Sequence, residues 1–151
     1  MKVNECMSSL PEFLPSNCSI SDAARHMTDM NCGYFPIAEN DRLIGIVTDR
    51  DIVVRALANG VSLDDKVSNI QSPTVLYCWE DDDVTVVLNN MSKQHVQRLI
   101  VLNNEKSMDM IGVITLADIA DRVENDPVLA EKIVDCCRHY QRPNRIEKEI
   151  G

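Results

Sequence analysis

The chain repeats itself, and this repeat constrains the fold more than any other feature of the sequence. The segment GIVTDRD at residues 45–51 returns as GVITLAD at residues 112–118, 67 positions later. Further upstream, the residues that follow Val3 align with those that follow Val67 at a shift of 64. The shift grows to 67 because the second repeat has a longer turn, NNEKSMDM in place of ENDRL. The repeat predicts two similar structural units.

Both repeats show the same order of predicted elements. Apolar residues at helical spacing predict a helix that starts near Ile20 in the first repeat and near Val84 in the second. Ser19 and Asp83 precede these positions and are suitable helix N-caps. Short apolar runs then predict two strands in each repeat, and the second of these is rich in β-branched residues. These runs cover residues 34–38, 43–47, 97–102 and 110–114.

A second helix is expected at the end of each repeat. Its apolar positions extend to Leu57, with Gly60 as a suitable C-terminal cap, and to Val123 in the second repeat. One unit of about 60 residues has a small core and would be only marginally stable alone. We therefore expect a mixed α/β (α+β) fold in which two βαββα-type repeats pack sheet to sheet with pseudo-two-fold symmetry. The predicted domains are repeat 1 at 1–61, repeat 2 at 62–124 and a C-terminal helix with a charged tail at 125–151.

The C-terminal segment follows the repeats and has its own helix signal. Asp126 and Pro127 are typical of the first turn of a helix. The charged end after residue 140 is expected to be frayed or loosely docked. The predicted apolar stripe of this helix consists of Leu129, Ile133, Cys136, Cys137 and Tyr140.

The break from an apolar run into Thr-x-x-Asp occurs in both repeats and has two interpretations. Thr48 with Asp51, and Thr115 with Asp118, fit a helix capping box in which Thr is the N-cap and the acid lies three residues later. Capping explains the Thr and the Asp, but it does not explain the glycine three residues before each Thr. It also does not explain why both repeats carry the motif at the end of the same predicted strand.

The second interpretation of the motif is a ribonucleotide site. The N-terminus of a helix presents unpaired N–H groups that suit a phosphate, and the Thr hydroxyl adds a donor. An Asp one turn later can accept both hydroxyls of a ribose, as acidic residues do in dinucleotide-binding folds. A glycine in the preceding strand would let a flat base approach the backbone closely.

The tandem repeat with GIVTDRDI and GVITLADI resembles a pair of cystathionine-β-synthase-type (CBS) domains over about residues 3 to 123. The resemblance implies an α/β module that binds adenosine-containing ligands such as AMP, ADP, ATP or S-adenosylmethionine in clefts between the repeats. It also implies a regulatory role and frequent dimerisation. The second repeat departs from the first at Ile100, which replaces Pro36, and at Leu116 and Ala117, so we expect unequal sites.

The resemblance implies ligand contacts in both repeats. The two acids of the motifs would hold the ribose hydroxyls, and the two threonines would contact phosphate or ribose. Backbone at the strands would read the adenine edge, and two arginines would face phosphate, with Lys93 and His95 as weaker phosphate candidates. The implied ligand-binding residues are Tyr34, Phe35, Ile46, Thr48, Arg50, Asp51, Arg98, Val113, Thr115 and Asp118.

Composition excludes several other classes of protein. The net charge of −9 disfavours a nucleic-acid partner, which would require a basic face. The apolar runs are far shorter than the roughly 20 residues that span a bilayer, and the N-terminus lacks the apolar segment of a secretory signal. The six cysteines have no CxxC spacing, so we expect small apolar residues in a reducing cytoplasm and no metal site.

No catalytic constellation is present in the sequence, so we predict that the chain is not an enzyme. It lacks the GxxxxGK[ST], GxGxxG, GxSxG and HExxH motifs, and the acidic run at 80–83 is explained as charge compensation at a helix N-terminus. Two hypotheses remain. The chain is a sensor that passes adenosine-ligand occupancy to a partner protein, or a ligand-free structural and interaction module with vestigial clefts. A homodimer is expected in either case, parallel or antiparallel.

Overall fold

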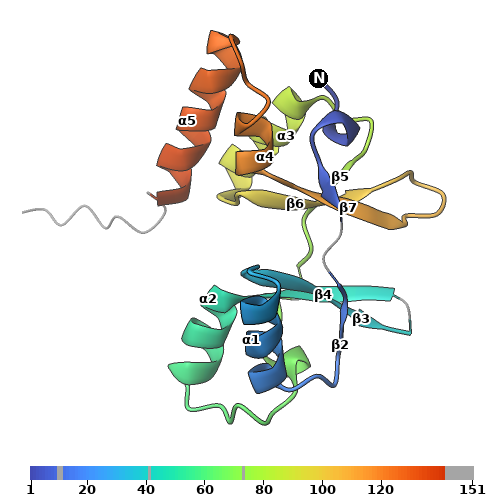
Figure 1. Cartoon of the computed structure of the whole chain (residues 1–151), viewed down its shortest axis with the longest axis vertical. Coiled ribbons are helices and arrows are strands. Elements are labelled where there is room, and N and C mark those ends of the chain that lie inside the picture. The colour runs from blue at the N-terminus through green and yellow to red at the C-terminus, as the bar shows by residue number, and fades with distance from the viewer. Residues whose placement is uncertain (10–11, 41, 73, 142–151) are drawn as a thin grey trace, which may run out of the picture. The chain divides into compact units, whose positions relative to one another are not determined.

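The structure is a computed structural model of the 151-residue chain. It describes residues 1–9, 12–40, 42–72 and 74–141, with side chains up to residue 138 in the last stretch. The chain divides into two compact units, each with its own sheet and helices (Figure 1). The repeat-1 unit is Pro11–Val75, and the repeat-2 unit is Met1–Leu10 together with Leu76–Gly151. The segment that precedes each repeat in the chain is therefore part of the other compact unit. The domain boundaries given above remain a prediction about the sequence repeats.

The repeat-1 unit has a three-stranded sheet with the order β2-β3-β4. Strand β2 is parallel to β3, and β3 is antiparallel to β4. Its core contains Phe35, Ile37 and Val47 from the sheet, together with Ile20 and Ala56 from the helices. The elements are β2 (Leu14–Pro15), α1 (Ile20–Asp29), β3 (Tyr34–Glu39), β4 (Arg42–Thr48), α2 (Asp49–Asp51), the π-helical segment η2 (Ile52–Leu57) and the 3-10 turn η3 (Val67–Asn69).

The repeat-2 unit has a four-stranded sheet with the order β1-β7-β6-β5. Strand β5 is parallel to β6, β6 is antiparallel to β7, and β1 from the N-terminal segment is antiparallel to β7. The elements are the 3-10 turn η1 (Val3–Glu5), β1 (Ser8–Ser9), β5 (Tyr77–Trp79), α3 (Val84–Gln94), β6 (Arg98–Leu102), β7 (Met110–Thr115), α4 (Leu116–Ala120) and α5 (Pro127–Gln141).

The predicted α/β fold, with a βαββα order in each repeat and a C-terminal helix, is confirmed. Both predicted helix caps are present. The Ser19 hydroxyl accepts a hydrogen bond from the Asp22 N–H at 3.0 Å, and the Asp83 carboxylate accepts one from the Thr85 N–H at 2.8 Å. The hydrogen bonds from Thr85 lower the pKa of the Asp83 carboxyl below its usual range.

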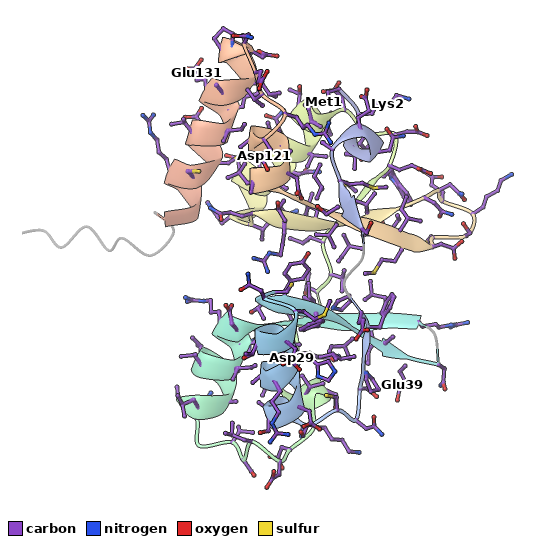
Figure 2. All side chains as sticks on the ribbon, viewed as in Figure 1. Met1, Lys2, Asp29, Glu39, Asp121 and Glu131 are labelled. Carbon is purple, nitrogen blue, oxygen red and sulfur yellow. The ribbon has the colours of Figure 1, made fainter. Side chains whose placement is uncertain are left out.

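The helices that end the two repeats differ. In the repeat-1 unit, α2 continues into η2 as far as Leu57, and Gly60 follows with a positive φ of 68°. In the repeat-2 unit, α4 ends at Ala120, and Asp121, labelled in Figure 2, is its C-cap. The prediction that this helix reaches Val123 is therefore wrong. The chain turns away through a left-handed residue, Asn125, to start α5.

Helix α5 packs on α3 and α4 and completes the core of the repeat-2 unit. Leu129 and Cys136 are buried, Ile133 packs against the same cluster, and the Cys136 thiol donates to the Leu88 carbonyl at 3.2 Å. Cys137 is exposed, so its place in the predicted apolar stripe is wrong. Adjacent helical residues point about 100° apart, and the helix turns Cys136 rather than Cys137 toward α3. The Tyr140 side chain lies outside the described residues.

Candidate ligand-binding site

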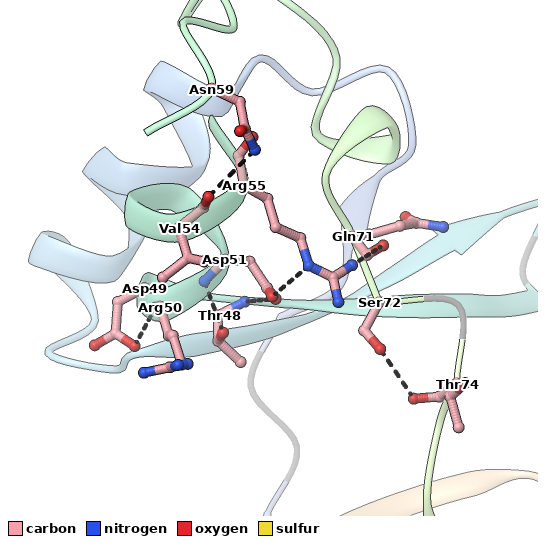
Figure 3. Close-up of polar contacts among 10 residues, drawn as sticks. All are labelled: Thr48, Asp49, Arg50, Asp51, Val54, Arg55, Asn59, Gln71, Ser72 and Thr74. Atoms are coloured by element: carbon pink, nitrogen blue, oxygen red, sulfur yellow. Dashed lines mark hydrogen bonds and ion pairs between the residues drawn. The ribbon is translucent and has the colours of Figure 1, made fainter. Parts of the chain in front are cut away.

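Both Thr-x-x-Asp motifs form complete capping boxes where a strand passes into a helix. In the first motif, the Thr48 N–H donates to Asp51 Oδ2 at 2.9 Å and the Asp51 N–H donates to Thr48 Oγ1 at 3.2 Å (Figure 3). In the second motif, the corresponding bonds between Thr115 and Asp118 measure 2.8 and 3.1 Å. The capping interpretation is therefore correct for both motifs, and it uses one carboxylate oxygen, Oδ2, of each Asp.

The other carboxylate oxygen, Oδ1, has a different partner in each motif. Asp51 Oδ1 forms an ion pair with Arg55 Nε at 3.5 Å, and Arg55 also donates to the Gln71 carbonyl at 3.3 Å (Figure 3). Asp118 Oδ1 accepts a hydrogen bond from the Ser8 hydroxyl at 2.9 Å. Sequence reasoning missed Arg55 and Ser8. The i,i+4 spacing from Asp51 is the signal for Arg55.

The neighbouring backbone is sufficient to explain the glycines of the motifs. A Cβ atom on Gly45 would lie 2.7 Å from the Ser72 carbonyl oxygen, and one on Gly112 would lie 2.7 Å from the Ser8 carbonyl oxygen. Ser8 and Ser72 are equivalent at the 64-residue shift of the repeat. Each glycine therefore gives room to the segment that precedes the other repeat, and this accounts for the glycine without a bound base. The approach of an adenine to these strands stays a prediction.

The first turn after Thr48 offers few free donors to a phosphate. The Asp49 N–H donates to the Gly33 carbonyl at 2.9 Å, and the Arg50 N–H donates to the Asp49 carboxylate at 2.8 Å. The Asp51 N–H is used by the cap. The expectation of unpaired N–H groups at this helix end is therefore wrong for the first motif, because side chains and a carbonyl already satisfy them.

The predicted strand residues lie beside the motifs within each unit. Tyr34 pairs with Thr48 across β3 and β4, and Arg98 pairs with Thr115 across β6 and β7, so Tyr34 and Arg98 occupy equivalent positions. Val113 pairs with both Ser8 and Ile100. The structure thus gathers Tyr34, Thr48, Arg50 and Asp51 in one unit, and Arg98, Val113, Thr115 and Asp118 in the other.

Two predicted residues have limited ways of contacting a ligand. The Phe35 side chain is fully buried in the core of the repeat-1 unit, with its ring edge-to-face to His26 at 6.1 Å between ring centroids. Both main-chain groups of Ile46 bond to Ser72, so its backbone is already paired. A base would therefore reach Ile46 through its half-buried side chain. The weaker candidates Lys93 and His95 are exposed at the end of α3.

The buried thiols do not resemble nucleophiles. Burial raises the pKa of the Cys78 thiol to about 12, and the carboxylate of Asp82 adds to the effect. Burial also raises the pKa of Cys6, with Asp118 as the second cause. A thiol that stays protonated near pH 7 is a poor nucleophile. Within the described part of the chain, no group of three or more His, Cys, Asp or Glu side chains could hold a metal ion.

A cavity of ≈ 300 Å³ lies in the repeat-2 unit, apart from the predicted site residues. None of those residues lines it. Its lining is acidic and includes one indole ring. The lining residues are Trp79, Asp81, Asp82, Asn103, Asn104 and Glu105.

No helix in the described ranges is both long enough and apolar enough to cross a membrane.

Comparison with known protein families matches residues 3–57 and 67–125 to the CBS domain. The chain therefore belongs to the CBS domain family and carries two copies of the domain. The matched ranges contain both Thr-x-x-Asp motifs with the glycines that precede them. Together with the two compact units of the fold, this membership defines the chain as a CBS domain pair.

Curated relatives cover most of the chain. The uncharacterized protein YlbB of Bacillus subtilis is 30% identical over 121 residues, which is 79% of this chain and 80% of YlbB. Hypoxic response protein 1 of Mycobacterium tuberculosis is 31% identical over 104 residues, 68% of this chain and 71% of that protein. An L-aspartate semialdehyde sulfurtransferase of Methanocaldococcus jannaschii is 30% identical over 119 residues, but the match spans only 22% of that enzyme.

Solved structures share the fold. The CBS domain pair of protein MJ0100, in complex with 5′-methylthioadenosine and S-adenosyl-L-methionine, matches with a TM-score of 0.70 and 28% identity. The match covers 81% of this chain and 94% of that one. Hypoxic Response Protein I, solved with two coordinated zinc ions, matches with a TM-score of 0.71 and 26% identity, covering 82% of this chain and 100% of that one.

Proposed function

We propose that this CBS domain pair binds an adenosine-containing ligand through its two Thr-x-x-Asp motifs and reports occupancy to a partner protein. The main support for this proposal is that both motifs provide an equivalent carboxylate. Asp51 and Asp118 use one oxygen for the same helix cap and keep the second oxygen outside it. A ribose diol donates hydrogen bonds to a carboxylate in this way in dinucleotide folds. The adenosine ligands bound to the related MJ0100 pair support this choice of ligand class.

The proposed ligands are AMP, ADP, ATP and S-adenosylmethionine. The Thr48 and Thr115 hydroxyls contact the ribose or a phosphate, and the guanidinium groups of Arg50 and Arg98 attract phosphate. Side-chain cations take this role because the first-turn N–H groups of the first motif are already paired. The base lies along the strand ends, against Tyr34 and the half-buried Ile46 side chain, and near the backbone of Phe35 and Val113.

We further propose that the signal is a population shift, reported through a homodimer surface. The η2 segment supports this surface because Val53, Val54 and Leu57 are 55, 46 and 68% exposed. Single exposed apolar residues are common, but three on one segment of six residues are typical of an interaction surface. The corresponding positions of the second repeat hold Ala120, Asp121 and Glu124.

The proposal assigns no catalytic step to the chain. The activity of the sulfurtransferase relative belongs to a protein of which the match spans 22%. The six cysteines are all unpaired, which supports the reducing cytoplasm as the proposed location.

The second candidate function is a structural module whose motifs are caps alone. The completeness of both capping boxes favours it, because each Thr and each Asp already has a role without a ligand. In that case the partner protein would bind the module irrespective of adenosine ligands.

Calorimetric titration with AMP, ATP and S-adenosylmethionine distinguishes the two functions. The sensor predicts saturable binding to the wild type and a ligand-dependent rise in melting temperature. The double variant Asp51→Ala and Asp118→Ala should lose both. Asp83→Ala is the matched control, because it also removes a capping carboxylate and one negative charge but lies outside the motifs. Binding that survives the double variant contradicts the site, and no binding of any of the three ligands favours the structural module.

A further inference from the structure

The two motif carboxylates present different acceptor environments to a ribose. Asp118 accepts hydroxyl hydrogen bonds at both oxygens, from Thr115 Oγ1 at 2.8 Å on Oδ2 and from Ser8 Oγ at 2.9 Å on Oδ1. At Asp51 Oδ1, the contact is the 3.5 Å ion pair with Arg55. Within the described residues, Thr48 donates no hydroxyl hydrogen bond to Asp51. A hydroxyl–carboxylate hydrogen bond is the same bond that a ribose hydroxyl would form.

Ser72 is the counterpart of Ser8, and its hydroxyl has a different partner. Both serines lie beside the glycine of a motif, at the equivalent position of the segment that precedes a repeat. The Ser72 hydroxyl donates to the Thr74 carbonyl at 3.4 Å (Figure 3). The Ser8 hydroxyl is instead directed to Asp118. The two equivalent serines therefore have hydroxyl groups with different partners.

Among the described residues, an arginine pairs with Asp51 but not with Asp118, and the helices that end the two repeats explain this difference. Arg55 and Arg122 both follow their motif Asp by four residues. Helical structure continues through Arg55 to Leu57, which brings its guanidinium to Asp51. Helix α4 ends at Ala120, before Arg122, so the helical i,i+4 geometry is lost. Asp118 Oδ1 pairs with Ser8 instead.

We propose that the Ser8 hydroxyl is an internal competitor for the ribose at Asp118, so that the Asp51 motif binds an adenosine ligand first. This inference rests on the proposed function. The main chain of Ser8 is fixed opposite Val113 in the sheet, which holds the hydroxyl at the carboxylate at a high effective concentration. An incoming ribose must displace this hydroxyl from Oδ1, whereas at Asp51 no hydroxyl has to leave that oxygen.

The test uses adenosine, which is uncharged and reports on the ribose contact without a phosphate. Calorimetric titrations in an Asp51→Asn background isolate the Asp118 motif, and titrations in an Asp118→Asn background isolate the Asp51 motif. In the first background, Ser8→Ala should tighten adenosine binding by about three- to tenfold, the scale of one typical intramolecular hydrogen bond. Ser8→Thr keeps the hydroxyl and should restore the affinity of that background.

Ser72→Ala in the Asp118→Asn background is the matched control, and its adenosine affinity should stay within about twofold. Weaker or unchanged binding in Ser8→Ala overturns the role of Ser8 while leaving the proposed function intact. An equal gain in Ser72→Ala also overturns it, because the effect would then not depend on Asp118. If neither adenosine nor AMP binds the wild-type chain, the proposed function fails and the role of Ser8 fails with it.

Discussion

The two repeats share one motif geometry and differ in what surrounds it. Both motifs cap a helix with the same pair of hydrogen bonds, which differ in length by about 0.1 Å. In the repeat-1 unit, the helix that ends the repeat is longer, and an arginine forms an ion pair with Asp51. In the repeat-2 unit, this helix is short and is followed by α5, and a serine donates a hydrogen bond to Asp118. Local sequence therefore fixes the cap, and more distant segments determine how each carboxylate is occupied.

The largest predicted effect concerns the helix that only the repeat-2 unit has. Leu129 of α5 is 8% exposed and Leu57 of η2 is 68% exposed. Leu129→Ala should lower the free energy of unfolding by about 2–4 kcal/mol, because it leaves a cavity in the core. Leu57→Ala should change it by less than about 0.5 kcal/mol in the monomer. Chemical denaturation measures both values, and similar losses would contradict the placement of α5.

The second prediction asks whether the motif glycines have the same role in both units. Gly45→Ala and Gly112→Ala should each destabilise the chain by about 1–3 kcal/mol, because the added Cβ would clash with a main-chain carbonyl. Gly33→Ala is the control, since its Cβ would meet the movable carboxylate of Asp49. Thermal unfolding of the three variants gives the ranking. A Gly33 variant as unstable as the other two would indicate that glycine itself, and not the neighbouring backbone, is required.

The smallest effect compares the N-caps of the first helices. Ser19→Ala and Asp83→Ala should each cost about 0.5–1 kcal/mol at pH 7, at the lower end because both sites are at the surface. The pKa of Asp83 is lower in the folded chain than in the unfolded one. Its contribution is therefore present above the unfolded value of about 3.9 and is lost as the pH falls through the folded value. Denaturation at pH 7 and pH 3 should show the Asp83 effect shrinking with acid.

Ser19 is uncharged, so the cost of Ser19→Ala should stay constant over the same pH range. An acid dependence of equal size in both variants would mean that the pH effect arises elsewhere in the chain. That result would contradict the predicted difference between the neutral cap in one repeat and the charged cap in the other.

Much of the fold could be predicted from the sequence because its signals are local. Helical spacing, the caps at Ser19 and Asp83, and the four longer strands each depend on residues near in the chain. The short strands β1, β2 and β5 have two or three residues, too few to show an alternating pattern. The early end of α4 at Ala120 has no such local signal, and the left-handed residue Asn125 follows it before α5 begins.

The helix caps of the candidate site could be predicted from the sequence, whereas the other partners of the two carboxylates could not. The Thr and Asp positions follow from the motif alone, and their capping bonds are present in both units. The contact of Ser8 with Asp118 joins residues 110 positions apart, and a single sequence carries no direct signal for it. The alignment of Ser8 with Ser72 indicates that the two segments are equivalent, but it does not indicate which strand each segment joins.

The most direct test of the central claim is an NMR titration of the backbone amides with AMP. The Thr48 and Thr115 N–H groups donate to the two carboxylates that we assign to the ribose. We predict saturable shifts of these amides in the wild type and none in the double variant Asp51→Ala and Asp118→Ala. Saturable shifts confined to the acidic cavity around Trp79, with Thr48 and Thr115 unchanged, would contradict the assignment.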